Sequence, residues 1–243
     1  GNRNFGNSTI FTGNLVYKHP LFLEVLEQVC PLVEERLGSS FQVSEFKLVT
    51  SVKSEDFRMW WHRDFPYGDD IDERIDKQIS LAIIIPLCDF STASGSTYVL
   101  PESHLIKRFP AEYKKPDHIG DGVQLTSNIG DIWIYDPRTI HSGAPNKLQK
   151  LRHIMLLQFI IPVLSCREDF KYQIERSPFR SSFLESNKRI WNTHRPDTNA
   201  FGSNRGWEDT AFKAFFSFFR RGSIFISRVS NRIKYALLMF GLR

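Results

Sequence analysis

Residues 130–159, "GDIWIYDPRTIHSGAPNKLQKLRHIMLLQF", hold two apolar, β-prone runs separated by a polar stretch that contains Gly, Pro and Asn. This arrangement predicts two strands joined by a turn. A hairpin of this kind returns the chain alongside itself. We therefore expect Arg152, which opens the second strand, to lie deep in the same cavity as His141, which follows the first.

The sequence on the N-terminal side of this stretch has the same texture. Short apolar runs rich in aromatic and β-branched residues alternate with Gly, Pro, Asp and Asn, and they fall at 41–52, 57–65, 78–87 and 95–103. Several short strands at such spacing favour a sandwich or barrel. The run "SLAIIIPL" is apolar enough to be buried on both faces. We predict a mainly β fold.

Helical spacing of apolar residues brackets this β region. Residues 19–38 predict one or two helices, with a break or kink at Pro31 and a stop at Gly38. In the C-terminal segment apolar residues recur at intervals of three and four, with Arg and Lys largely between them, at Ile226, Val229, Ile233, Leu237 and Phe240. That pattern predicts an amphipathic helical extension.

These changes of texture predict three parts. Residues 1–170 form the β domain with its N-terminal helices, 171–208 form a loop-rich cover or linker, and 209–243 form a basic amphipathic helical tail. No internal repeat or low-complexity tract is evident in the sequence.

The net charge of +5 is concentrated in the tail. No acidic residue follows Asp209, whereas seven of the 32 basic residues do, which leaves 25 basic against 27 acidic residues elsewhere. A near-neutral main part argues against a nucleic-acid-binding protein. A basic amphipathic helix suits an anionic membrane surface, so 210–243 predicts either interfacial binding, docking on the β domain, or contact with RNA or a partner protein.

Other bulk features predict a cytoplasmic protein. The three cysteines are scattered and lack metal-ligand or redox spacing, which disfavours a disulfide framework. We find no signal-peptide pattern and no apolar run long enough to span a bilayer. An interfacial tail would then place the protein at the inner face of a membrane.

The stretch "MWWHRDFPYGDD" at 59–70 places His62 and Asp64 two residues apart. On a strand both side chains point the same way and Arg63 points the other way. An imidazole and a carboxylate at one point supply two thirds of a 2-His-1-carboxylate triad, which holds Fe(II) and leaves positions open for other ligands. The third ligand must come from a later strand, and His141 is the best candidate. Arg152 beside such a metal could donate two parallel hydrogen bonds to a carboxylate. It could therefore hold the carboxylate of a dicarboxylate cosubstrate that lies away from the metal.

Three blocks together carry a family resemblance. "WHRDF", "LAIIIPLCDFSTASGSTYVLPESH" and "GDIWIYDPRTIHSGAPN", with Arg152 eleven residues after His141, resemble the phytanoyl-CoA dioxygenase-like family of Fe(II)- and 2-oxoglutarate-dependent oxygenases. The resemblance covers about residues 40–162. Two positions depart from the family pattern: Glu102 stands where Gly is usual, and Gly143 stands where a hydroxyl residue often follows the distal histidine.

The resemblance implies a double-stranded β-helix core and an enzyme that uses Fe(II), 2-oxoglutarate and O2. It implies His62, Asp64 and His141 as metal ligands and Arg152 as the residue that holds the 2-oxoglutarate carboxylate. Further candidates for cosubstrate contact are Lys47, Thr97 and Ser142. The implied reaction releases succinate and CO2 and hydroxylates a C–H bond of a small organic substrate. If the tail binds a membrane surface, the possible substrates include lipids, acyl thioesters and lipid-linked glycans.

Substrate contacts are predicted for residues close to the ligands, namely Trp60, Phe65 and His104. For the aromatic residues the alternative is packing between sheets. Two other function classes fit the same residues: a non-catalytic binding module on this fold, and a zinc hydrolase with two His and one Asp. Only the oxygenase reading needs Arg152 at its spacing.

Overall fold

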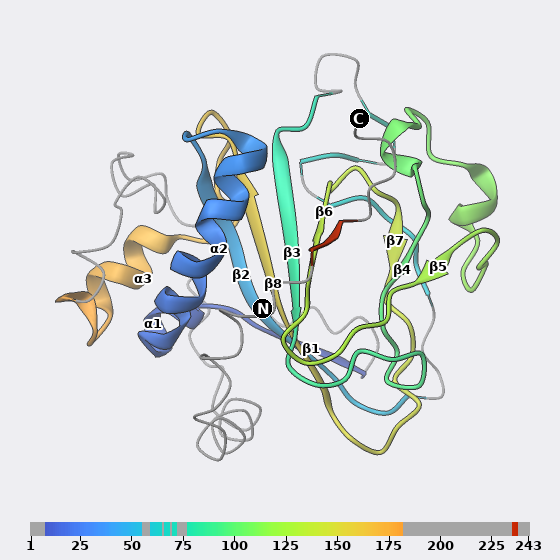
Figure 1. Cartoon of the computed structure of the whole chain (residues 1–243), viewed down its shortest axis with the longest axis horizontal. Helices are drawn as coiled ribbons and strands as arrows, with labels where there is room; N and C mark the ends of the chain where they lie inside the picture. The colour runs from blue at the N-terminus through green and yellow to red at the C-terminus, as the bar shows by residue number, and fades with distance from the viewer. Residues whose placement is uncertain are drawn as a thin grey trace.

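The computed structural model describes residues 8–54, 59–64, 66–68, 70–71 and 77–181, together with the backbone of 235–237. Two sheets face each other, and the helices cover the outer face of the larger sheet (Figure 1). The helices are α1 (Leu15–Lys18), α2 (Leu21–Leu37) and α3 (Phe170–Arg176), with short 3₁₀ turns η2 (Ser103–Leu105) and η3 (Ala111–Lys114). The predicted mainly β fold is confirmed.

The larger sheet has the order β1-β2-β8-β3-β6-β9. Its strands are β1 (Thr9–Thr12), β2 (Gln42–Ser51), β3 (Ser80–Pro86), β6 (Ile132–Tyr135), β8 (Arg152–Ile160) and β9 (Tyr235–Leu237). The smaller sheet has the order β5-β4-β7, with β4 (Tyr98–Val99), β5 (Val123–Gln124) and β7 (His141–Ser142). All pairings are antiparallel except β6 with β9.

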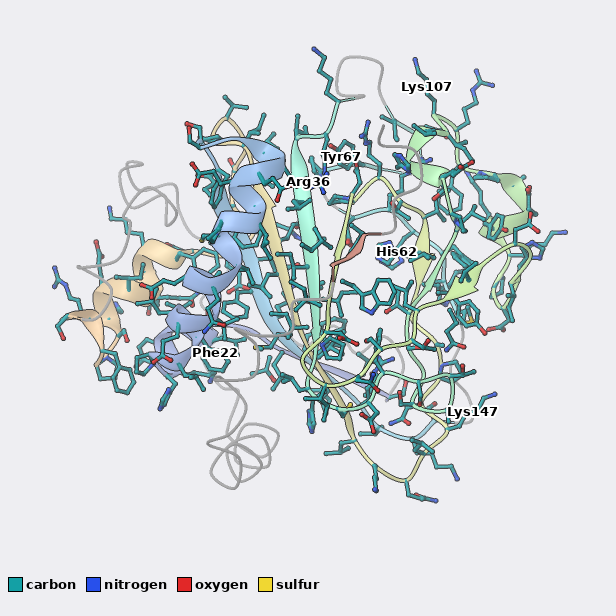
Figure 2. All side chains as sticks on the ribbon, in the orientation of Figure 1. Phe22, Arg36, His62, Tyr67, Lys107 and Lys147 are labelled. Carbon is teal, nitrogen blue, oxygen red and sulfur yellow. The ribbon has the colours of Figure 1, made fainter. Side chains whose placement is uncertain are left out.

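The large sheet is buried on both faces, which explains its apolar strands. On β8, Met155, Leu157 and Phe159 belong to the cluster beneath the helices, whereas Ile154 and Leu156 pack in the cluster between the two sheets. This alternation is the period of two that a strand requires. Figure 2 shows Phe22 on the helix side and His62 on the opposite side, towards the small sheet. The predicted double burial of 80–87 is confirmed, because every residue of β3 is buried.

Helix α2 runs through Pro31 as one element, so of the two alternatives expected for 19–38 the structure has the single helix, without a break. Proline removes one backbone donor from a helix interior, at a cost of about 3 kcal/mol. Burial of Leu26, Val29, Leu32 and Val33 on both sides of Pro31 offsets this cost. The predicted stop is confirmed at Gly38, whose φ of 77° suits glycine and whose N–H bonds to the Glu34 carbonyl.

The hairpin expected for 130–159 is wrong. Strand β7 pairs with β4 in the small sheet, whereas β8 pairs with β2 and β3 in the large sheet. The connection between them is held by Asn146, whose amide donates to the carbonyls of Ser51 and Lys150. The two strands therefore approach the space between the sheets from opposite sides, and not as neighbours.

The expected strand at 57–65 is also wrong for its described residues, 59–64, which form a single bridge between His62 and His141. Hydrogen bonds from side chains, and not a continuous pairing with a neighbouring strand, hold this segment. The indole of Trp61 donates to the His118 carbonyl at 2.5 Å, and the Met59 N–H donates to the Asp117 carboxylate at 2.9 Å.

The C-terminal predictions differ in outcome. Helix α3 lies in the stretch expected to be loop-rich, and Phe170 and Ile174 join the core beneath α2, because that stretch still carries buried apolar residues.

Tyr235–Leu237 form strand β9 on the edge of β6, so the helical prediction is wrong there. An open sheet edge supplies backbone hydrogen-bond partners, and these override the helical spacing of the apolar residues. The rest of 182–243 lies outside the described residues. Among the helices that are described, none is both long and apolar enough to cross a bilayer.

Candidate metal centre

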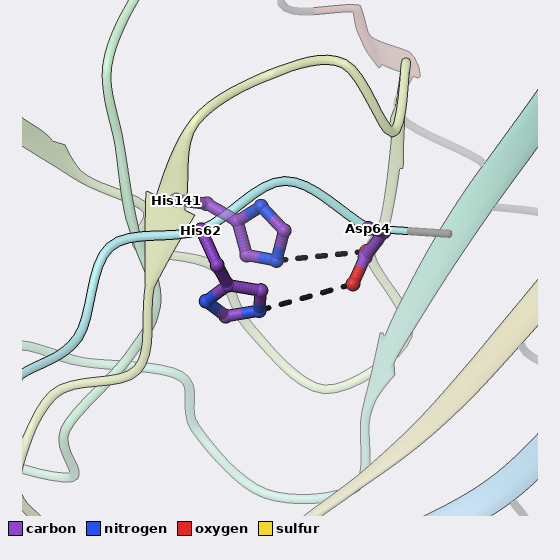
Figure 3. Close-up of side chains that lie close together, drawn as sticks. All are labelled: His62, Asp64 and His141. Atoms are coloured by element: carbon purple, nitrogen blue, oxygen red, sulfur yellow. Dashed lines mark ion pairs between the residues drawn. The ribbon is translucent and has the colours of Figure 1, made fainter. Parts of the chain in front are cut away.

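His62, Asp64 and His141 converge at one point between the two sheets (Figure 3). One ligand atom from each lies within 4.8 Å of the others. The Nε2 atom of His62 is 3.8 Å from Asp64 Oδ1, and the Nε2 atom of His141 is 3.5 Å from Asp64 Oδ2. The three side chains that the sequence singled out are therefore brought together.

Backbone hydrogen bonds create this convergence. His62 and His141 exchange N–H···O bonds of 2.9 and 3.0 Å, and the Asp64 N–H donates to the Pro137 carbonyl at 3.0 Å. Arg63 points to the other side, as its place between the ligands predicts, and its guanidinium donates to the carbonyls of Arg138 and Ile106 at 2.9 and 2.5 Å. The segment 59–64 is not a strand, but its backbone hydrogen bonds hold His62 and Asp64 next to His141 of β7.

Both histidines have a backbone carbonyl beside Nδ1. His62 Nδ1 lies 3.1 Å from the Trp60 oxygen, and His141 Nδ1 lies 2.9 Å from the Thr139 oxygen. A carbonyl can only accept, so each Nδ1 carries a proton, which leaves Nε2 as the metal-binding nitrogen of each ring. Burial lowers the pKa of His141, which keeps this ring neutral, the form that binds metals.

Asp64 is kept ionised by its neighbours. Burial alone would raise its pKa, but His141, His62 and a hydrogen bond from Tyr135 outweigh burial and lower the pKa. The Tyr135 hydroxyl donates to Asp64 Oδ2 at 2.7 Å. We did not single out Tyr135 from the sequence, where the apolar run "IWIY" indicates only a core position.

Arg152 lies on the face of β8 that looks towards the small sheet, the face it shares with Ile154. It is 5% exposed, and its Nη2 donates to Ser51 Oγ at 2.6 Å. Nε and Nη1 are buried and find no hydrogen-bond partner within the described part of the chain. Burial lowers the pKa of Arg152 to about 10, so the side chain stays charged at neutral pH.

The other cosubstrate candidates are placed differently. Lys47 lies opposite Leu156 and shares the inter-sheet face, but its ammonium is paired with Glu45. Thr97 is buried two residues before Val99. Ser142 pairs with Tyr98 whereas His141 pairs with Val99, so Ser142 lies on the opposite face from the ligand. The structure does not bring Ser142 to the metal ligands.

The three residues predicted to contact the substrate also differ in where they lie. Trp60 is 57% exposed, Phe65 lies outside the described residues, and His104 is half-buried in η2. Burial lowers the pKa of His104, with Asp136 and Arg138 acting on it in opposite directions. Asp136 and Arg138 form a salt bridge of 2.6 Å that shapes the turn before His141.

The fold and the site together define a class of protein: a mainly β chain that places two histidines and one carboxylate between two sheets. The chain belongs to the Phytanoyl-CoA dioxygenase (PhyH) family, whose sequence profile matches residues 10–154. The resemblance stated from the three sequence blocks is confirmed.

Similar proteins support the same class. The Iron/alpha-ketoglutarate-dependent dioxygenase ausO of Aspergillus calidoustus is 28% identical over 160 residues, which covers 60% of this chain and 52% of that protein. The chain thus spans about half the length of this curated relative. HygX from Streptomyces hygroscopicus, solved with nickel and 2-oxoglutarate, superposes with a TM-score of 0.54 at 13% identity, covering 65% of this chain and 72% of HygX. The non-heme alpha ketoglutarate dependent epimerase SnoN from nogalamycin biosynthesis gives 0.52 at 16% identity, with 66% and 65% covered. At these identities the two structures show a shared fold.

Proposed function

We propose that the chain is an Fe(II)- and 2-oxoglutarate-dependent dioxygenase on a double-stranded β-helix core. It would hydroxylate an unactivated C–H bond of a small organic molecule and release succinate and CO2. Two observations carry the proposal: the two-histidine, one-carboxylate site between the sheets, and a buried arginine on the inter-sheet face of β8, two of whose donor nitrogens have no hydrogen-bond partner among the described residues. Family membership supports the same conclusion.

The donor set fits iron. Two imidazole nitrogens and one carboxylate oxygen are the ligands of non-haem Fe(II) oxygenases, and they leave positions open on the opposite face. Bound there, iron would supply the oxidative chemistry, while the chain positions the reactants and excludes water. Because Asp64 provides a carboxylate ligand, we favour hydroxylation over halogenation, which needs that position for chloride.

The surroundings of Arg152 fit a carboxylate. A buried guanidinium without an anion is unfavourable, and an anion that accepts from Nε and Nη1 would remove this penalty. The Ser51 hydroxyl accepts from Nη2, so its own hydrogen is free to donate to the same anion. We therefore assign the far carboxylate of 2-oxoglutarate to Arg152 and Ser51. Sequence reasoning missed Ser51, because only the pairing of β2 with β8 places it opposite Arg152.

A zinc hydrolase would have no use for this anion site, and a non-catalytic binding module would have no need to keep all three metal ligands together with it. No feature of the described residues favours either alternative over the oxygenase.

Turnover of the cosubstrate tests the proposal. Fe(II)-loaded wild type in air should convert 2-oxoglutarate to succinate, slowly even without the substrate, and His141→Ala should not. His153→Gln is a matched control, because His153 bonds to Thr50 and points away from its neighbour Arg152. Succinate from wild type and His153→Gln alone supports the proposal. Equal succinate from wild type and His141→Ala, or none from any iron-loaded protein, contradicts it.

A further inference from the structure

Tyr135 touches two of the three predicted metal ligands. It ends strand β6 opposite Ala82, within the cluster between the sheets, and is 7% exposed. Its hydroxyl donates to Asp64 Oδ2 at 2.7 Å, and its ring centroid lies 5.3 Å from that of His141 in an edge-on contact. A tyrosine at this point therefore contacts the carboxylate and the distal histidine together.

The hydroxyl adds nothing that packing requires. The neighbours of Tyr135 in this cluster are apolar, and a phenylalanine ring would fill the same volume. A buried hydroxyl needs a hydrogen-bond partner, and the partner here is one particular oxygen of Asp64. An ionised carboxylate can only accept, so the Tyr135 hydroxyl is the donor in this contact.

The two oxygens of Asp64 thus have different surroundings. Each oxygen faces one ligand nitrogen, Oδ1 at 3.8 Å from His62 Nε2 and Oδ2 at 3.5 Å from His141 Nε2, but Oδ2 in addition accepts the hydrogen bond from Tyr135. A carboxylate can bind a metal through one oxygen or both, and a strong hydrogen bond to one oxygen disfavours its use as a ligand. Partners of this kind orient a ligand and tune its basicity.

We propose that Tyr135 is a positioning residue that restricts Asp64 to metal binding through Oδ1 alone. The inference rests on the proposed metal function and concerns what keeps the site open. Two histidine nitrogens and one carboxylate oxygen occupy half of the positions of an octahedral ion. A second oxygen from Asp64 would take a further position, and the bidentate cosubstrate would then fill those that remain. Tyr135 preserves the position that O2 needs.

The test is Tyr135→Phe, loaded with Co(II) as a redox-stable stand-in for Fe(II). Without the hydroxyl, Asp64 is no longer pre-oriented, so Co(II) affinity should fall by about 10- to 100-fold in competition titrations. A crystal structure of the loaded variant should show both Asp64 oxygens on the metal. Tyr113→Phe is the matched control: it also removes a buried hydroxyl with a hydrogen bond, the one to the Asp121 N–H, away from the ligands. Its Co(II) affinity should equal that of wild type.

Two outcomes overturn the proposal: Co(II) affinity of Tyr135→Phe within threefold of wild type, or Asp64 still bound through one oxygen in the loaded variant. Failure of the underlying function looks different, because wild type itself would then bind no Co(II). Circular dichroism and denaturation of both variants separate a loss of metal binding from a loss of folding.

Discussion

Two groups of charged residues lie along β2 and its neighbours, and they differ in how their charge is satisfied. At one end Arg152 donates to Ser51, and its Nε and Nη1 have no hydrogen-bond partner among the described residues. At the other end lies a charged cluster in which Glu45 pairs with both Lys47 and Arg167, and Glu168 accepts from the Phe46 N–H and from Gln173.

This difference separates structure from function. A buried charge with partners of opposite charge, as Glu45 has in Lys47 and Arg167, acts on the stability of the fold. A buried charge with unused donors lowers stability and gains a partner only when a ligand binds. By this criterion we propose that Arg152 marks a ligand site, and that Lys47, which the sequence also offered as a cosubstrate contact, has a structural role. Each prediction below tests one side of this comparison.

The largest effect is expected for Arg152→Met. Affinity of the metal-loaded protein for 2-oxoglutarate should fall by about 100-fold or more, roughly 3 kcal/mol, because the carboxylate loses its charged partner. The apoprotein should be at least as stable as wild type, since an unpaired buried charge has been removed. Anaerobic calorimetry and urea denaturation measure the two quantities. If the variant binds 2-oxoglutarate normally, or if its apoprotein is clearly destabilised, Arg152 has a structural role and does not bind the cosubstrate.

Lys47→Met should show the opposite pattern. Glu45 is buried and would keep only Arg167, 3.5 Å away, so the free energy of unfolding should fall by about 1–3 kcal/mol. The affinity for 2-oxoglutarate should stay within threefold of wild type. Lys115→Met, at an exposed position, controls for loss of a surface charge. A tenfold loss of 2-oxoglutarate affinity in Lys47→Met would break the comparison and restore Lys47 as a cosubstrate contact.

Ser51→Ala should have a smaller effect at the ligand end. Loss of one hydroxyl donor should weaken 2-oxoglutarate binding by about five- to tenfold, close to 1 kcal/mol. Metal affinity should not change, because Ser51 contacts Arg152 and none of the three metal ligands. Parallel titrations with Co(II) and with 2-oxoglutarate separate the two. Unchanged 2-oxoglutarate affinity would limit the role of Ser51 to holding Arg152.

The smallest effect concerns Glu168 and pH. Burial raises the pKa of Glu168 from 4.5 to about 7. Between these values the folded protein binds more protons than the unfolded chain, so the stabilisation present at low pH is lost as pH rises through this window. From pH 5 to pH 8, wild type should lose on the order of 1 kcal/mol more than Glu168→Gln, which stays neutral. Urea denaturation at both pH values measures the difference, and Glu175→Gln, an exposed change on α3, should behave as wild type. Parallel pH profiles of wild type and Glu168→Gln would contradict this account.

Sequence reasoning succeeded where function depends on local spacing. His62 and Asp64 are two residues apart and share a side, and the order and spacing of the later blocks pointed to His141, which the structure places beside them. It failed where function depends on pairing between distant strands. Ser51 meets Arg152 only through the register of β2 with β8, and Tyr135 meets Asp64 only across the two sheets. The hairpin prediction failed for the same reason, because hydrophobic pattern does not say which sheet a strand joins.

The central claim is that His62, Asp64 and His141 hold Fe(II) with room for 2-oxoglutarate. The most direct test is an anaerobic titration of the apoprotein with Fe(II) and 2-oxoglutarate, in which the visible metal-to-ligand charge-transfer band of the chelate is recorded for wild type and His62→Ala. We predict a band that saturates with one iron and one 2-oxoglutarate per chain in wild type and is absent in His62→Ala. A folded wild-type protein that shows no band, or a His62→Ala variant that shows the same band, would contradict the account.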